Sequence, residues 1–344
     1  MIHDFESRAA ELLDPGLYDY FAGGAGDEIT LRDNVESWKR WALAPRVLQG
    51  VEQRDTSVTV LGRRRAHPVF VAPTAYQRGA HADAELGTAR AAAATGSTLV
   101  LSSQTTTDPR EVAAASGDAD RWLQLYVFKD RAVTDDLVQA AQDGGYEALV
   151  VTVDFPVGGR RERDLRSGYV VEHPTYVQLT AGPTTPAERH AMHDPSLTWE
   201  DIAAIQESSG LPVLLKGILS PSDAARAVDL GFAGVIVSNH GGRQLDTVLS
   251  GADALAPVVD AVAGRIDVLV DGGIRRGWDV AKALALGADA VLVGRPVLWG
   301  LACEGEAGVR TVLQQLIDEL DSTLALIGCP RAADLDTSFV TRRA

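Results

Sequence analysis

The chain has 344 residues, of which 46% are hydrophobic and 23% are charged. This ordinary globular composition argues against a disordered, collagen-like or disulfide-scaffold protein. Acidic residues outnumber basic ones by 47 to 32, and the resulting net charge of −15 makes nucleic acid and anionic membrane surfaces unfavourable partners.

The two cysteines, Cys303 and Cys329, are too few to form a disulfide framework or a zinc site by themselves. We therefore expect a reducing compartment and no metal. No run of residues approaches the roughly 18 apolar residues that a membrane span requires, and the first residues lack the pattern of a signal peptide. The expected location is the cytoplasm.

Residues 1–66 predict an N-terminal helical cap with one short strand at 58–62. Eight short apolar runs follow, and Ala-rich or amphipathic stretches separate most of them; the runs are 69–75, 97–103, 121–128, 148–154, 212–217, 233–239, 267–273 and 290–296. They lack strict alternation, which is typical of strands buried on both faces. Strand–helix alternation with eight strands predicts an α/β fold, the (β/α)₈ TIM barrel. An open, doubly wound sheet is the alternative, and the count of eight favours the barrel.

Residues 155–211, after the fourth strand, lack a clear period until a helical pattern begins near Thr198. Because long irregular segments inside compact domains are usually functional, we expect a lid over the barrel mouth. No linker or charge run divides the chain, so residues 1–344 are expected to form a single domain.

Barrel enzymes carry their chemistry at the C-terminal ends of the strands, and every predicted strand here ends in a polar group or a glycine. These residues are Thr74, Ala75 and Tyr76; Ser102 and Gln104; Gln124 and Tyr126; Thr152 and Asp154; Lys216; His240; Asp271 and Gly273; and Gly294. One such residue alone is often a helix cap or a surface charge. Eight strand ends together predict an active site.

The last two strands predict a phosphate site. Gly273 and Arg275 follow the seventh strand, and Gly294 and Arg295 follow the eighth, where many barrels bind phosphate. Glycine lets backbone N–H groups approach an anion closely, and arginine offers a bidentate fork to its oxygens.

His240 is the candidate general base, because an unperturbed imidazole titrates near physiological pH. Asp154, two strands away on the same rim, is placed to orient it. Arg161 and Arg243 indicate an anionic substrate, plausibly a carboxylate. Lys216 is expected either to hold a cofactor anion or to form a Schiff base.

Several motifs together resemble those of the FMN-dependent α-hydroxy acid oxidases, the family of glycolate oxidase, lactate oxidase, mandelate dehydrogenase and the flavin domain of flavocytochrome b2. The most specific motifs are SNHGGRQLD (238–246) and DGGIRRGWDVAKALALGADAVLVGRP (271–296). Further similar stretches lie along nearly the whole chain, at 18–34, 71–77, 101–103, 124–131, 149–154, 159–161 and 214–219.

The resemblance implies FMN as the cofactor and a role for each matching position. His240 matches the family's base and Asp154 its carboxylate partner. Substrate contacts are implied for Tyr20, Tyr126, Arg161, His240 and Arg243, with Tyr126 near the substrate hydroxyl. Flavin contacts are implied for Thr74, Ala75, Ser102, Gln124, Thr152, Lys216, Asp271, Gly273, Arg275, Gly294 and Arg295, with Lys216 beside N1 and C2=O of the ring.

The implied reaction oxidises an (S)-2-hydroxy acid to the 2-oxo acid, with two electrons passing to FMN as a hydride or through a carbanion. Ala75 matches an alanine common in the family's oxidases, which favours O₂ as acceptor and H₂O₂ as product over a dehydrogenase with another acceptor. The family also commonly forms homotetramers.

Three residues depart from the glycolate oxidase pattern around the substrate. Gln104 stands in place of a tryptophan, Tyr76 in place of a methionine and Phe128 in place of a tyrosine. Losing a large indole should open space, so we expect a substrate larger than glycolate, either mandelate-like or medium-chain aliphatic. The rival interpretations are an FMN-dependent isomerase, a Schiff-base aldolase using Lys216, and a catalytically inactive binding module.

Overall fold

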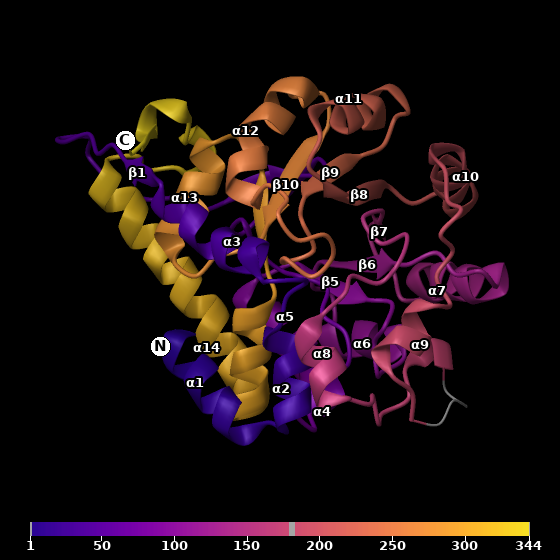
Figure 1. Cartoon of the computed structure of the whole chain (residues 1–344). Helices are drawn as coiled ribbons and strands as arrows, with labels where there is room; N and C mark the ends of the chain where they lie inside the picture. Colours follow the sequence, from indigo (N-terminus) through magenta and orange to yellow (C-terminus); the bar gives the residue numbers. More distant parts are fainter. Residues whose placement is uncertain (1, 179–182, 344) are drawn as a thin grey trace.

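The computed structural model describes residues 2–178 and 183–343. Eight parallel strands form a closed barrel, as the strand count predicts, because β11 pairs with β4 and joins the two ends of the sheet (Figure 1). The barrel strands are β4 (Val69–Val71), β5 (Leu99–Ser102), β6 (Arg121–Leu125), β7 (Leu149–Thr152), β8 (Val213–Ile218), β9 (Gly234–Val237), β10 (Asp267–Asp271) and β11 (Ala290–Val293). The open-sheet alternative is therefore wrong.

Helices connect the strands and surround the barrel. They are α4 (Gln77–Ala80), α5 (Ala84–Thr95), α6 (Pro109–Ser116), α7 (Arg131–Asp143), α10 (Trp199–Ser209), α11 (Pro221–Asp229), α12 (Gly251–Val262), α13 (Gly277–Ala285) and α14 (Arg295–Ile327). The long α14 consists of two helices that meet at non-helical backbone at Glu304 and Gly305. Within the described residues, no helix is long and apolar enough to cross a membrane.

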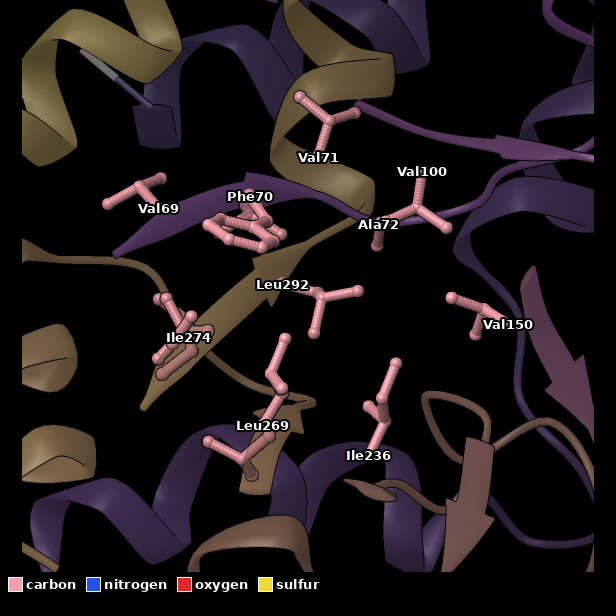
Figure 2. Close-up of a cluster of buried hydrophobic side chains, with 14 of the residues drawn as sticks. Val69, Phe70, Val71, Ala72, Val100, Val150, Ile236, Leu269, Ile274 and Leu292 are labelled. Carbon is pink, nitrogen blue, oxygen red and sulfur yellow. The ribbon is translucent and has the colours of Figure 1, made fainter. Parts of the chain in front are cut away.

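The interior of the barrel is layered. One buried apolar layer is formed by Phe70, Val100, Trp122, Val150, Leu214, Ile236, Leu269 and Leu292. Figure 2 shows side chains from several of these strands gathered around one space. Because side chains on the same face of a strand recur every second residue, the residue two places later on each strand faces the barrel mouth. That next layer is polar on six of the eight strands, and it forms the floor of the site described below.

The N-terminal end of the barrel is closed by a hairpin of β2 (Val58–Val60) and β3 (Arg63–Arg65). The side chain of Arg65 is only 1% exposed, and its guanidinium lies 2.5 Å from Asp120 and 2.8 Å from Glu147. Asp120 directly precedes β6 and Glu147 lies two residues before β7, so this buried arginine forms ion pairs with two carboxylates near the start of neighbouring strands.

The predicted cap of residues 1–66 is thus divided between the two ends of the barrel. Besides the hairpin it contains α1 (Ile2–Leu12), α2 (Pro15–Ala22), α3 (Ile29–Lys39) and β1 (Trp41–Leu43). Helices α2 and α3 lie at the mouth, whereas α1 packs along α14 (Figure 1). The last segments are η2 (Ala332–Asp334), η3 (Thr337–Phe339) and β12 (Val340–Arg342), and β12 pairs antiparallel with β1.

The predicted lid, residues 155–211, contains α8 (Glu162–Ser167), η1 (Tyr176–Gln178), α9 (Pro186–His190) and α10; its residues 179–182 lie outside the described part of the chain. Helix α10 begins at a capping box on Thr198 and precedes β8, so it belongs to the barrel rather than to the lid. A buried arginine, Arg189, holds the lid together: it donates to Thr184 (2.7 Å) and Thr175 (3.3 Å), and its guanidinium lies 5.3 Å from the Tyr76 ring.

Candidate active site

A cavity opens at the C-terminal ends of the strands, where barrel enzymes carry their chemistry. Most of the residues predicted for the site line it. They are Tyr20, Thr74, Ala75, Gln124, Tyr126, Thr152, Lys216, His240, Arg243, Asp271, Gly273, Arg275, Gly294 and Arg295. Among the residues not predicted, Phe21 and Leu298 also line it. The barrel topology therefore brings together side chains that lie up to 275 positions apart in the sequence.

His240 is presented to the cavity by an unusual turn after β9. His240, Gly241 and Gly242 all have positive φ angles, of 59°, 65° and 75°. Two glycines adopt this backbone easily, whereas a histidine there is strained and must be held by its surroundings. Part of that support comes from Ser238, whose Oγ accepts a hydrogen bond from the His240 backbone N–H at 3.0 Å.

Both ring nitrogens of His240 have partners. Nδ1 lies 2.9 Å from Oδ1 of Asp154, and Nε2 lies 3.2 Å from the hydroxyl of Tyr126. Donation from Nδ1–H to the carboxylate leaves Nε2 as the basic nitrogen. Burial lowers the pKa of His240, and Asp154 opposes that shift. Burial also acts to raise the pKa of Asp154, but His240 and Lys216 outweigh it and keep that pKa below its usual value. The pair is thus a neutral imidazole beside an ionised carboxylate.

Arg161 and Arg243 both lie near the Tyr20 ring, with guanidinium carbons 5.8 and 4.8 Å from its centre. Arg243 donates to the carbonyl oxygens of Tyr20 (2.6 Å) and Gly23 (3.0 Å). Burial and the neighbouring Arg161 lower the pKa of Arg243. Arg161 itself does not line the cavity; it lies 3.5 Å from Asp164 and donates to the Arg243 carbonyl. Two adjacent buried cations favour binding of an anion at this position.

Arg295 is buried without a carboxylate partner. It donates only to backbone carbonyls, those of Phe21 (3.0 Å), Gly241 (3.0 Å) and Gly23 (2.9 Å). Burial, followed by the nearby Arg243 and Arg275, lowers the pKa of Arg295 to about 9. Burial lowers the pKa of Arg275 as well. Within residues 2–178 and 183–343, neither Arg275 nor Arg295 forms an ion pair, so both are available to a phosphate.

Lys216 is fixed from two sides. Its ammonium donates to Ser238 Oγ at 2.8 Å and forms an ion pair with Asp271 at 3.0 Å. A Schiff base requires the free amine as nucleophile, whereas this amine is the ion-pair partner of a carboxylate. The other carboxylate oxygen of Asp271, Oδ1, is buried with no hydrogen-bond partner. It can therefore accept a hydrogen bond from a bound molecule.

The residues of the cavity fit FMN. The unpaired guanidinium groups suit a phosphate, and the free oxygen of Asp271 suits a polyol hydroxyl. Gln124 is held by Thr152, to which its amide donates at 3.0 Å, and by Ser102, which donates to it at 3.2 Å from outside the cavity. This chain of hydrogen bonds presents a rigid polar floor to a ring system with several N–H and C=O groups.

The three residues predicted to set substrate size, Gln104, Tyr76 and Phe128, are all buried and none of them lines the cavity. Gln104 Nε2 lies 3.3 Å from Nε2 of His193, and the Phe128 ring packs edge-on against the same histidine at 5.1 Å. The Tyr76 ring lies 5.6 Å from the Tyr20 ring and is tilted by 44° to it. They form a second layer around the residues that touch the cavity.

Sequence reasoning missed the aromatic wall that the lid adds to the site. His193 stacks on Tyr126 at 4.4 Å, and Phe155 lies 5.6 Å from the His240 ring and 4.8 Å from His190. Burial lowers the pKa of His193 to about 4 and that of His190 to about 2, so both are neutral. The only signal in the sequence was two histidines three residues apart inside an otherwise irregular segment.

It also missed a pair of asparagines that joins α3 to the loop carrying His240. Asn34 donates to Asn239 at 2.9 Å, and Asn239 donates back to Asn34 at 2.8 Å. The Gly273 turn packs directly on this pair, since a Cβ atom there would lie 1.8 Å from the Asn34 carbonyl oxygen. The absence of a side chain at Gly273 is therefore required by close packing on α3 as well as by its positive φ of 81°.

Comparison with known proteins agrees with this geometry. Residues 9–342 match the family model described as FMN-dependent dehydrogenase. The chain is 44% identical to human 2-hydroxyacid oxidase 1, over 99% of this chain and 96% of that protein. It is 46% identical to L-lactate oxidase of Nostoc sp., over 98% of this chain and 97% of that protein. A crystal structure of mandelate oxidase superposes with a TM-score of 0.92 at 42% identity, covering 100% of this chain and 98% of the other.

Proposed function

Because this chain belongs to the FMN-dependent dehydrogenase family and is an FMN-dependent 2-hydroxy-acid oxidase, we propose that its substrate is an (S)-2-hydroxy acid larger than glycolate. The proposal assigns the role of base to His240 and the role of electron acceptor to O₂. One arrangement carries it: a buried neutral imidazole, with a carboxylate on one nitrogen and a tyrosine hydroxyl on the other, beside two buried arginines.

The arginines bind and orient the substrate. Arg243, from the cavity wall, and Arg161, from behind it, provide fixed positive charge for the substrate carboxylate. Both guanidinium groups lie near the ring of Tyr20. Backbone carbonyls take up N–H donors of Arg243 that face away from the cavity, so the remaining donors are directed at the substrate.

His240 removes the proton. Its Nε2 accepts a proton from the substrate, and the Asp154 carboxylate stabilises the imidazolium that forms. The Tyr126 hydroxyl, 3.2 Å from Nε2, lies where it also contacts the substrate hydroxyl. The product 2-oxo acid has two protons and two electrons fewer than the substrate.

Bound FMN supplies the two-electron acceptor. Arg275 and Arg295 would hold its phosphate, Asp271 its ribityl hydroxyls and Lys216 the polar edge of its ring. Ala75 lines the same cavity, and we retain it as the residue that favours O₂ over another acceptor.

Two observations support a substrate larger than glycolate. Gln104 is smaller than the indole of the glycolate oxidase pattern, but it lies behind the cavity wall, where its amide contacts His193. The solved structures most similar to this chain include mandelate oxidase with bound (S)-4-hydroxymandelic acid, with a TM-score of 0.92 at 41% identity. The lid residues Phe155 and His193 offer aromatic faces for such a side chain.

An anaerobic visible spectrum of the holoenzyme tests this proposal. We expect the flavin bands to bleach faster with (S)-mandelate or a 2-hydroxy fatty acid than with glycolate, and to return when air is admitted. A much higher kcat/KM for glycolate would disprove the size argument. Failure of air to restore the bands would disprove O₂ as the acceptor. Flavin that bleaches with none of these acids would disprove the proposed substrate class.

A cytoplasmic location and a homotetramer remain predictions for this chain. Analytical ultracentrifugation of the holoenzyme tests the second, because a dimer or monomer would contradict it.

A further inference from the structure

Strand β8 contains a bulge at its mouth end. Lys216 pairs with Ile236 of β9 and Ile218 pairs with Val237, so Gly217 has no partner in that ladder. Its φ angle is +112°, a backbone conformation that residues with side chains rarely adopt. Such bulges re-aim side chains near active sites.

The space beside Gly217 is filled by Asp154. A Cβ atom at position 217 would lie 2.5 Å from both the Cβ and the Cγ of Asp154, and 2.9 Å from its backbone nitrogen. Real Cβ atoms do not approach other atoms so closely, and the backbone nitrogen cannot easily move away. A side chain at 217 would therefore displace the Asp154 carboxylate from its place behind His240.

We infer that Gly217 is a positioning residue for the reaction: its missing side chain lets the Asp154 carboxylate lie 2.9 Å from Nδ1 of His240. The same bulge follows directly on Lys216, whose ammonium contacts Ser238 and Asp271. Gly217 thus adjoins two groups of the site: Lys216, which faces the cofactor cavity, and the Asp154 carboxylate, which supports His240. The inference rests on the proposed role of His240, but its structural half can be tested without substrate.

The first test is Gly217→Ala in protein freed of FMN, with the His240 ring followed by NMR during a pH titration. Because Asp154 raises the pKa of His240, its displacement should lower that pKa further. An unchanged pKa of His240 would overturn the inference. This measurement requires no catalysis, so it stays informative even if His240→Ala shows that the base lies elsewhere.

The second test uses the holoenzyme. We expect Gly217→Ala to slow flavin reduction by about 10- to 100-fold, part of the roughly 10²–10⁴-fold that general acid–base catalysis contributes. The acid limb of its pH profile should move to lower pH, and FMN affinity should change by less than about threefold. Loss of FMN affinity with no movement of the pH profile would contradict the inference.

A matched control and a double variant separate positioning from general damage. Gly231 has a φ of +74° and no atom within 4 Å of its Cβ position, so Gly231→Ala introduces backbone strain without a clash. It should leave the His240 pKa and the rate unchanged. Asp154→Gly removes the Cβ and Cγ atoms that a 217 side chain would meet and leaves only the backbone nitrogen at 2.9 Å, so adding Gly217→Ala to it should slow the reaction much less than Gly217→Ala does alone. The inference is overturned if the rate losses of the two single variants simply add in the double variant. It is also overturned if Gly217→Ala misfolds and the double variant misfolds to the same extent.

Discussion

The two ends of the barrel bury arginine in opposite ways. At the closed N-terminal end, Arg65 is surrounded by two carboxylates from neighbouring strands. At the mouth, Arg295 is partly buried, donates to backbone carbonyls and has no carboxylate partner among the described residues. The first arrangement is electrostatically complete within the chain, and the second is completed by an anion from outside.

This difference teaches how stability and function are divided along the barrel axis. A buried charge without a counter-charge is costly, and proteins keep one where binding a ligand offsets that cost. Burial is the main cause of the lowered pKa of Arg243, Arg275 and Arg295. The mouth is therefore the end of the barrel where positive charge is electrostatically unfavourable. Variants at the N-terminal end should therefore change stability, and variants at the mouth should change binding and rate.

The largest expected effect is at the mouth. His240→Ala should reduce the rate of flavin reduction by about 10²–10⁴-fold, because it removes the residue that we propose as the general base. The thermal midpoint and the visible spectrum of bound FMN should stay close to those of the unaltered enzyme. Stopped-flow reduction with saturating hydroxy acid measures this, and near-normal reduction would remove His240 from the mechanism.

At the opposite end, Arg65→Met should lower the free energy of unfolding by about 3 kcal/mol, because it leaves Asp120 and Glu147 without their buried partner. FMN affinity should not change. Urea denaturation measures the loss. Arg63→Met is the matched control: Arg63 also contacts Glu147 but is 64% exposed, so its removal should cost less than about 1 kcal/mol.

Arg295→Met should show the reverse pattern. Loss of a charged hydrogen-bonding group of this kind is worth about 1.5–3 kcal/mol, so FMN should bind roughly tenfold to 100-fold more weakly. The FMN-free protein should be no less stable, since a buried unpaired cation has been removed. Fluorescence titration with FMN and denaturation of the FMN-free protein provide both numbers. Equal destabilisation by Arg65→Met and Arg295→Met would erase the contrast between the two ends.

A smaller effect is expected for Arg243, which we propose as a contact of the substrate carboxylate. Arg243→Lys keeps the charge but loses the bidentate fork, so kcat/KM for the hydroxy acid should fall roughly tenfold, mostly through a higher KM. Arg160→Lys serves as its control, because Arg160 is 76% exposed and pairs with Glu162. Similar kinetics for the two variants would mean that the substrate carboxylate binds elsewhere.

The smallest expected effect is on the pH dependence of stability, and it involves His193 in the lid. The folded-state pKa of His193, about 4, lies below the unfolded value of about 6.5, so the unfolded chain binds a proton in this window and the folded chain does not. Stability from this residue is fully present above about pH 6.5 and is lost as the pH falls towards 4. Unfolding at pH 5 and pH 7 measures the loss, and His193→Phe, which keeps a ring against Tyr126, should reduce it. An identical pH dependence in that variant would assign it to other groups.

The barrel could be predicted because each of its strands is buried on both faces and therefore reads as an apolar run. The mouth residues followed from the same pattern, since a strand's end fixes which side chains lie on the rim. His240 and Asp154 meet because strands β9 and β7 flank β8, a neighbour relation that the strand count already implies.

What sequence could not supply depends on contacts between segments without a period. The lid brings His193 and Phe155 against Tyr126 through packing of irregular chain, for which local preference gives no direction. The partition of residues 1–66 between the two ends of the barrel is equally a tertiary result. Gln104 illustrates the limit: its type suggested an open pocket, but the side chain is occupied by a histidine that no pattern connected to it.

The pairing of β1 with β12 has a consequence for how the protein is made. Trp41 lies opposite Arg342, and Arg295 donates to the carbonyls of Phe21 and Gly23, so these parts of the first segments meet their partners only when the last segments have been made. At about 5–20 residues per second, translation separates these partners by roughly 15–60 s. A nascent or prematurely terminated chain would hold most of a barrel but not a working oxidase.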